Sequence, residues 1–153
     1  GVVKTPFYGG FGLIAADNIL KPSFNIFKLL HHLGEERIPL DSDSALLTRR
    51  KDGTYILAVW NYSAPEDAGT PKTVTLQLKN IKAKRAAISR VDRDHGDVHP
   101  LYEKMGSPRY PTTAQIKDLQ DASELGGPEP AKIQNGALTL TLPAKGLAVI
   151  ELK

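Results

Sequence analysis

Several kinds of residue are missing or rare in this chain, and each absence excludes a class of protein. The chain has no cysteine, so disulfide bonds and thiolate metal sites are excluded. No apolar run approaches the roughly 20 residues that a membrane-spanning helix requires. The 20 Lys and Arg residues are scattered among 17 Asp and Glu, whereas a nucleic-acid surface needs clustered cations. We therefore expect no contact with a membrane or with nucleic acid. The first residues lack the apolar stretch of a signal peptide, and the cellular location stays open.

Residues 22–33 follow the pattern of an amphipathic helix. Pro22 suits the first helical turn, where its missing N–H costs nothing. Apolar side chains recur at spacings of three and four and predict one broad apolar face. They are Phe24, Ile26, Phe27, Leu29, Leu30 and Leu33. Gly34 is then expected at the C′ position. A helix this short is marginal alone, so a neighbouring element must cover its apolar face.

From Arg37 onwards the apolar pattern changes from helical to alternating, which predicts strands. The strand candidates are 45–51, 54–62, 74–78, 86–91, 137–143 and 147–152. Asp52-Gly53 between the first two predicts a hairpin with a type I′ turn. Both faces of segment 54–62 are largely apolar, which favours a central position in its sheet. Residues 37–91 and 131–153 are therefore expected to form one antiparallel β-sandwich, with Trp60 in its core.

The strand pattern stops between Asp92 and Pro130. Thr112 and Gln115 form a capping-box signature, and Ile116, Leu119, Ala122 and Leu125 then trace one helical face. A shorter helical turn is expected around 101–105. The fold class is therefore mainly β: an antiparallel β-sandwich with a helical insertion at about 98–127. Insertions of this length are usually functional or interface-forming.

Several segments carry a family resemblance. Residues 7–13 read Phe-Tyr-Gly-Gly-Phe-Gly-Leu, residues 21–25 Lys-Pro-Ser-Phe-Asn, and residues 29–34 Leu-Leu-His-His-Leu-Gly. Residues 90–97 read Arg-Val-Asp-Arg-Asp-His-Gly-Asp, and residues 105–108 Met-Gly-Ser-Pro. This series resembles glycoside hydrolase family 39, the β-xylosidase family, over nearly the whole chain but only over the C-terminal third or so of the family's enzymes.

The resemblance implies a domain division. Residues 1–34 would be the last loop and helix of a (β/α)8 catalytic barrel, and residues 35–153 the C-terminal sandwich domain with its insertion. The partner would be the upstream barrel, in the same or a separate polypeptide, and through it a xylo-oligosaccharide or another glycoside. The family's retaining carboxyl pair would lie on barrel strands four and seven, upstream of Gly1. No catalytic dyad is nominated within this chain, and no cofactor or metal is expected.

Two local motifs deserve a chemical interpretation. Asp92, Asp94 and Asp97 have alternating carboxylates, as calcium loops do, but Gly96 is out of register with an EF-hand. His95 and His99 would need a helix and a third ligand to bind a metal. The competing interpretation is a strand-to-loop turn, in which the Asp side chains cap backbone N–H groups and Gly96 adopts a positive φ.

Two aromatic residues are candidates for a position near the sugar. Phe7 and Tyr8 adjoin flexible glycines, as in loops that border a sugar site at the top of a barrel, so we name both as candidate substrate-proximal residues. The leading hypothesis is the accessory region of a retaining β-xylosidase-like enzyme, non-catalytic by itself. The alternatives are a free carbohydrate-binding sandwich module and an assembly domain that forms a homo-oligomer through the helix 112–125.

Overall fold

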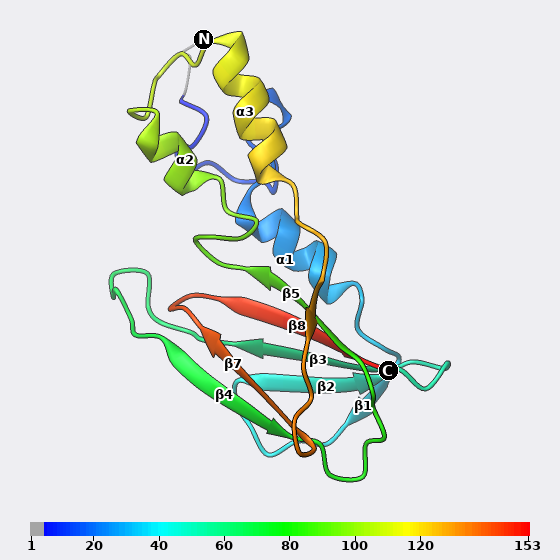
Figure 1. The fold of residues 1–153 in the computed structure, drawn as a ribbon. Coiled ribbons are helices and arrows are strands. Elements are labelled where there is room, and N and C mark those ends of the chain that lie inside the picture. The colour runs from blue at the N-terminus through cyan, green and yellow to red at the C-terminus, as the bar shows by residue number, and fades with distance from the viewer. Residues whose placement is uncertain (1–4) are drawn as a thin grey trace.

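The computed structural model describes residues 5–153 and contains two antiparallel β-sheets with helices at one end (Figure 1). The larger sheet has six strands in the order β1-β2-β3-β8-β5-β6. Its strands are β1 (Glu36–Ile38), β2 (Ala45–Arg49), β3 (Tyr55–Trp60), β5 (Ala86–Val91), β6 (Glu129–Ala131) and β8 (Leu147–Leu152). The smaller sheet pairs β4 (Lys72–Gln77) with β7 (Ala137–Leu142).

The two sheets enclose a common apolar core. Leu57 and Ile150 from the larger sheet lie in one buried cluster with Leu138 and Leu140 of β7. Val74 and Leu76 of β4 pack against this cluster and are half-buried. The predicted antiparallel sandwich is therefore present. The predicted central position of β3 is also confirmed, because β3 lies between β2 and β8.

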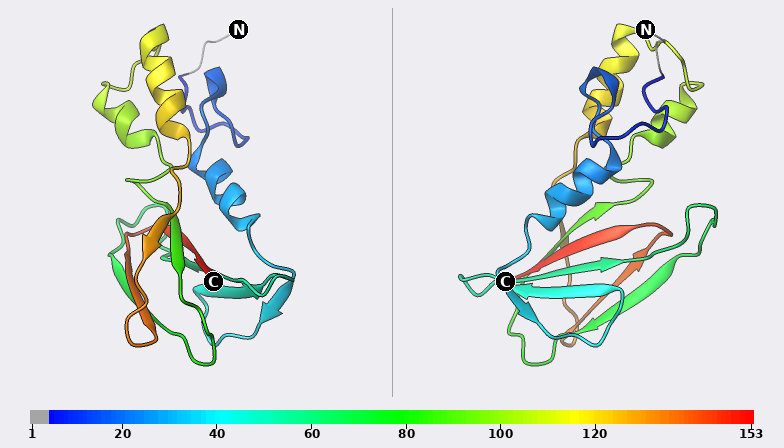
Figure 2. Two further views of the ribbon diagram at one scale, coloured as in Figure 1. Left: turned by 45° about the vertical axis from the view of Figure 1, so that its right-hand side comes forward. Right: turned by 180° about the vertical axis from the view of Figure 1, so that it is seen from behind.

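The helices form a separate layer beyond the larger sheet. They are α1 (Pro22–Leu30), α2 (His99–Lys104) and α3 (Thr113–Ser123), and a 3₁₀ turn η1 spans Ala16–Asn18. In both views of Figure 2, α1 lies between the sheets and the other helices. The predicted capping box begins α3, since Gln115 N–H donates to Thr112 Oγ1 and Thr112 N–H donates to Gln115 Oε1. In the part of the chain that the structure describes, no helix is long and apolar enough to cross a membrane.

Two local predictions are wrong. Asp52-Gly53 does not form a type I′ turn, because Gly53 has a φ of +87° while Asp52 is not among the positive-φ residues. Gly53 N–H donates to Arg50 O and Arg50 N–H donates to Thr54 O, which makes a three-residue loop with glycine in the left-handed position. Asp52 Oδ1 accepts from Thr54 N–H at 2.9 Å and favours this longer loop.

Gly34 is not the C′ residue of α1, because the helix already ends at Leu30 with His31 as its cap. A Cβ at position 34 would collide with the backbone of Arg49, so glycine is required there for close approach to β2. Gly34 N–H also donates to Thr48 Oγ1 at 2.8 Å. The edge strands β1 and β6 were not predicted, because three residues are too few to show an alternating pattern.

Candidate docking surface on the helical layer

Helix α1 has two apolar sides with different surroundings. Leu29 is 4% exposed and lies in a cluster with Ile56 and Val149 of the larger sheet. Ile26 also packs against this cluster. Phe27, in contrast, is 62% exposed. The predicted single apolar face is therefore divided: one side is covered by the chain's own sandwich, and the other is left uncovered within residues 5–153.

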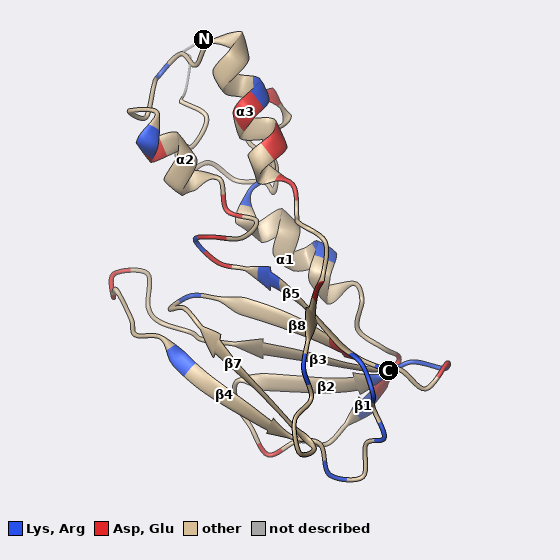
Figure 3. Cartoon of the chain, viewed as in Figure 1, with Lys and Arg blue, Asp and Glu red and all other residues tan. Residues whose placement is uncertain are grey.

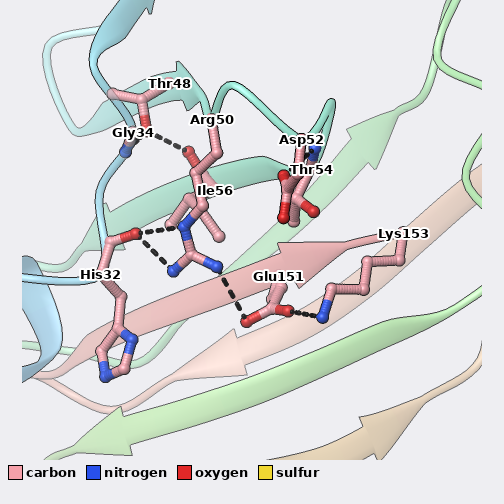
Figure 4. Close-up of polar contacts among 9 residues, drawn as sticks. All are labelled: His32, Gly34, Thr48, Arg50, Asp52, Thr54, Ile56, Glu151 and Lys153. Carbon is pink, nitrogen blue, oxygen red and sulfur yellow. Dashed lines mark hydrogen bonds and ion pairs between the residues drawn. The ribbon is translucent and has the colours of Figure 1, made fainter.

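Polar contacts fasten the C-terminal end of α1 to the sheet (Figure 4). Arg50 donates from Nε and Nη2 to His32 O at 3.0 and 2.6 Å. Its Nη1 atom lies 3.7 Å from Glu151 Oε2, and Lys153 pairs with the other oxygen of Glu151. Because Arg50 and Glu151 belong to the sheet region, these contacts tie the segment that follows α1 to the sandwich.

A buried asparagine joins three segments at the other end of α1. Asn25 is fully buried, and its Nδ2 donates to Gly96 O and to Ser123 O, each at 2.8 Å. Ser123 Oγ accepts from Leu20 N–H at 3.2 Å and donates to Gln120 O at 2.8 Å. The start of α1, the loop after β5 and the end of α3 are thereby held as one unit.

The segment before α1 folds back on itself in a tight turn. Ile14 bridges Leu20, and Asp17 and Asn18 between them have φ values of 60° and 58°. Short polar side chains tolerate this left-handed conformation better than others. Ile19 is fully buried against the helical insertion. Gln120 of α3 donates to Asp17 O at 2.6 Å, so the insertion holds the turn in place.

The two candidate substrate-proximal residues lie in different surroundings. The ring of Phe7 is half-buried and contacts His99 at a centroid distance of 4.5 Å and Tyr102 at 5.0 Å. Tyr8 is 51% exposed. A Cβ at Gly10 would collide with the Tyr8 ring, so glycine is required for this packing. Phe7 is thus anchored to α2, and Tyr8 next to it is partly exposed.

Most of the exposed large apolar side chains belong to the N-terminal segment and α1. This set, which we call the N-terminal apolar surface, comprises Tyr8, Phe11, Leu13, Ile14 and Phe27. Phe11 is fully exposed. Contiguous exposed apolar patches are typical of surfaces that contact another protein, which makes this set a candidate for such a contact. The N-terminal segment packs against the insertion through Ile19, and α1 packs against the larger sheet through Leu29.

The loop after β5 contains two Asp–His pairs. Asp92 Oδ1 lies 2.7 Å from His95 Nδ1 and accepts from Asp94 N–H. Asp97 Oδ1 lies 2.7 Å from His99 Nδ1 and accepts from His99 N–H. Gly96 has a φ of +63°. The interpretation of this segment as a capped turn is therefore confirmed.

The second pair shifts the ionisation of both partners. The hydrogen bond from Asp97 is the main cause that raises the pKa of His99, although burial opposes it. Burial is the largest influence on Asp97, but hydrogen bonds from the His99 side chain and backbone outweigh it and lower the pKa of Asp97. A protonated His99 opposite an ionised Asp97 is the arrangement that this geometry favours.

The described residues do not form an evident catalytic or metal centre. No group of three or more potential ligand side chains is found among residues 5–153. Asp92 is the one buried carboxylate in that range, and it is occupied by His95 and the turn backbone. Basic residues are most visible in the loop between β4 and β5 and are otherwise dispersed (Figure 3).

Trp60 does not form an exposed sugar platform. Its side chain is half-buried and packs against the cluster between α1 and the larger sheet. The prediction that Trp60 belongs to a core is thus confirmed in part, because the core is the one beneath α1 rather than the one inside the sandwich. Trp60 is only half-buried because it is the last residue of β3.

Comparison with known proteins decides the family. The model of glycosyl hydrolases family 39 matches residues 1–135. The chain belongs to this family. It is 31% identical to a beta-xylosidase of Geobacillus stearothermophilus, over 92% of this chain and 28% of that protein. It is 30% identical to a beta-xylosidase of Caldicellulosiruptor saccharolyticus, over 82% of this chain and 27% of that protein. The family 39 chain therefore spans little more than a quarter of these relatives.

Solved structures show the same fold. The family 39 chain superimposes on a monomeric beta-xylosidase from Caulobacter crescentus CB15 with a TM-score of 0.82 and 23% identity, covering 98% of this chain and 34% of that one. A family 39 beta-xylosidase from Caulobacter crescentus gives a TM-score of 0.80 at 27% identity, with 98% and 31% covered. Both likenesses include the sandwich, the insertion and α1, because nearly the entire chain is matched.

The sequence did not reveal the residues that fasten α1 and the N-terminal segment to the rest of the chain. Asn25 lies among apolar residues in α1, and a polar residue on an otherwise apolar helix face was the available signal. Ser123 and Arg50 gave no local signal, because their partners are distant in sequence: Leu20 for Ser123, His32 and Glu151 for Arg50. The partners of these side chains are determined only by how the helices and strands pack together.

Proposed function

We propose that this chain is the C-terminal accessory region of a retaining β-xylosidase-like glycoside hydrolase and that it braces the catalytic barrel. The observation that carries the proposal is the N-terminal apolar surface, in which Phe11 and Phe27 are 106% and 62% exposed. Burial of one such side chain is worth about 1.5–3 kcal/mol. A barrel that covered this surface would therefore be held firmly against the sandwich.

Hydrolysis itself is assigned to the part of the parent protein outside this chain. By the parent protein we mean the complete polypeptide that carries this chain. A retaining glycosidase needs two carboxyl groups about 5 Å apart on either side of the scissile bond. The one buried carboxylate among residues 5–153, Asp92, is committed to structural contacts. The substrate would be a xylo-oligosaccharide or a related β-glycoside, bound by the barrel.

Tyr8 is the residue of this chain that we place nearest to the substrate. Tyr8 is 51% exposed and lies on a loop that Phe7 anchors to α2. An aromatic ring held in this way can border a sugar site at the top of a barrel. Phe7 would act by positioning this loop, since its own ring packs against His99 and Tyr102.

The experiment compares the isolated chain with the parent protein on an aryl β-xyloside. We expect turnover by the parent protein and none by the isolated chain. The variant Phe27→Asp should lower the thermal stability and the activity of the parent protein, because a charge would enter the barrel contact. Tyr110→Asp is the matched control, since Tyr110 is 65% exposed and lies outside the N-terminal apolar surface. Equal effects of both variants, or turnover by the isolated chain, would refute the proposal.

A further inference from the structure

The loop that carries Tyr8 is held at both of its ends. At the first end, the ring of Phe7 packs against the ring of His99 in α2, at a centroid distance of 4.5 Å. Figure 1 shows the N-terminal segment beside this helix. At the second end, Lys21 Nζ donates to Gly10 O at 2.8 Å. The position of Tyr8 therefore depends on these two anchors.

Hydrogen bonds fix the two rings that Phe7 contacts. Asp97 Oδ1 accepts from His99 N–H at 2.9 Å and lies 2.7 Å from His99 Nδ1. The backbone and the ring of His99 are thus tied to the same oxygen atom. Tyr102 contacts the Phe7 ring edge-on, and its hydroxyl donates to Pro108 O at 2.9 Å. The first anchor is therefore built from side chains whose orientations are already set.

His99 is the member of this anchor whose charge changes with pH. The hydrogen bond and the charge of Asp97 raise the pKa of His99 above its ordinary value of 6.5, although partial burial lowers it. Glu103 of α2 also raises the pKa, and Arg93 of the loop after β5 lowers it. Arg93 and Glu103 form an ion pair with each other at 2.9 Å. The N-terminal segment brings the uncharged ring of Phe7 to this group.

We propose that His99 is a positioning residue whose protonated ring holds Phe7, and with it Tyr8, in the arrangement that borders the bound glycoside. A cation within about 6 Å of an aromatic centroid is attracted to the face of the ring, and His99 lies within this range of Phe7. Loss of the charge weakens this attraction and leaves the packing of the two rings. The inference rests on the proposed function, which places Tyr8 beside the substrate of the parent protein. Substrate affinity then depends on a titrating group outside the catalytic carboxyl pair.

Kinetics of the parent protein on an aryl β-xyloside test this role over a range of pH. His99→Phe keeps a ring against Phe7 and removes the charge. In mildly acidic solution, the KM of this variant should exceed that of the native protein about two- to fivefold, as expected for one partly exposed cation–π contact. At alkaline pH, where His99 is neutral, the two KM values should converge. The two kcat values should be equal at each pH, because the chemical step belongs to the barrel.

His95 offers a matched control for the loss of an imidazole. It lies 2.7 Å from Asp92 in an equivalent pair, and its side chain is 43% exposed against 41% for His99. The ring contacts of Phe7 are instead with α2. The KM of His95→Phe, relative to the native protein, should therefore be the same in acidic and alkaline solution.

A double variant shows whether His99 acts through Phe7. Phe7→Leu removes the aromatic partner, so the addition of His99→Phe should raise KM no further. NMR signals of the histidine rings in the parent protein give a readout that does not depend on turnover. His99 should titrate about half a pH unit lower in Phe7→Leu than in the native protein, because the ring face no longer favours the charged form. His95 should titrate at the same pH in both proteins.

Three results would overturn the inference. A KM ratio between His99→Phe and the native protein that is constant with pH would show that the charge does not affect substrate binding. An equal pH-dependent change in His95→Phe would indicate a general effect on the loop after β5. An unchanged titration of His99 in Phe7→Leu would exclude the contact between the charge and the ring. A parent protein that does not hydrolyse an aryl β-xyloside refutes the proposed function instead, and the NMR titration still tests the contact of His99 with Phe7.

Discussion

At the residue scale, a few polar side chains hold the helical layer to the sandwich. Asn25 and Ser123 are buried, so a backbone carbonyl beside them that loses its protein donor cannot form a hydrogen bond to water instead. Gly96 accepts from Asn25 and has a positive φ, and a Cβ there would lie 3.2 Å from Asn25 Nδ2. The packing of α1 against the loop after β5 and the end of α3 therefore depends on the side-chain amide of Asn25.

Replacement of Asn25 should destabilise the isolated chain strongly. Asn25→Ala leaves Gly96 O and Ser123 O without this donor, and buried groups left unsatisfied cost about 1–3 kcal/mol. We expect a loss of about 2–3 kcal/mol in the free energy of unfolding, measured by urea denaturation. Asn25→Asp, which has the same shape but no Nδ2 donor, should be no more stable than Asn25→Ala. The exposed His31→Ala on the same helix should change stability by less than about 0.5 kcal/mol.

The Asp97–His99 pair should make stability depend on pH. The pKa of His99 is raised by folding, so its contribution is complete below the unfolded-state value of 6.5 and is lost as the pH rises through the folded-state value. The pKa of Asp97 is lowered, so its contribution is complete above the unfolded-state value of 3.8 and is lost as the pH falls through the folded-state value. The pair should therefore stabilise the fold most between these two unfolded-state values.

NMR titration and denaturation can check this pH dependence. His99 should titrate at a lower pH in Asp97→Asn than in the native chain, because the charged partner is gone. The difference in unfolding free energy between the two proteins should be largest in mildly acidic solution and should shrink at alkaline pH. A difference that is constant with pH would contradict the pairing of charged groups.

At the element scale, the two sides of α1 have different environments. Its inner side contacts β5 and β8, and its C-terminal end is fastened by Arg50. Its outer side carries the exposed Phe27. A helix of this length is stabilised mainly by packing of its apolar face. The sandwich alone should therefore keep α1 folded, even where its outer side is uncovered.

Substitutions on the two sides of α1 should separate these roles. In the isolated chain Leu29→Ala should cost about 2–4 kcal/mol, because it leaves a cavity beneath the helix. Phe27→Ala should change the unfolding free energy by less than about 0.5 kcal/mol there, since the side chain is 62% exposed. In the parent protein, Phe27→Ala should become clearly destabilising. An equal cost in both contexts would argue against a barrel contact at Phe27.

At the scale of the whole molecule, the chain is a folded sandwich with an uncovered apolar surface at its helical end. The core between the sheets and the cluster beneath α1 share the larger sheet, so these parts are mechanically continuous. The N-terminal apolar surface lies beyond them on the N-terminal loop and α1. A protein with this distribution should tend to associate when the surface is left open.

Self-association of the isolated chain should therefore depend on the N-terminal apolar surface. The double variant Phe11→Ser with Phe27→Ser should lower the apparent mass at high concentration in analytical ultracentrifugation. The control double variant Tyr62→Ser with Tyr110→Ser removes exposed aromatic rings elsewhere and should not lower it. If the control reduces association equally, exposed aromatic area in general, rather than this surface, is responsible.

Much of the fold could be predicted from local pattern. Alternation predicted β3, β5, β7 and β8 closely, and the capping box at Thr112 located α3. The strands β1 and β6 were missed because their pairing depends on neighbours rather than on composition. The turn at Asp52 was assigned to the wrong type, since the side-chain contact to Thr54 N–H was not visible in the dipeptide.

The sequence by itself determined most of the elements, apart from the short edge strands β1 and β6, and the family that the chain resembles, because periodicity, caps and segment motifs are local properties of the chain. It also determined that α1 needs a neighbour. Only the tertiary structure decided that the sandwich covers one side of α1 and leaves Phe27 open, and that Phe7 packs against His99 of α2. These features depend on contacts between residues far apart in sequence, which no local pattern encodes.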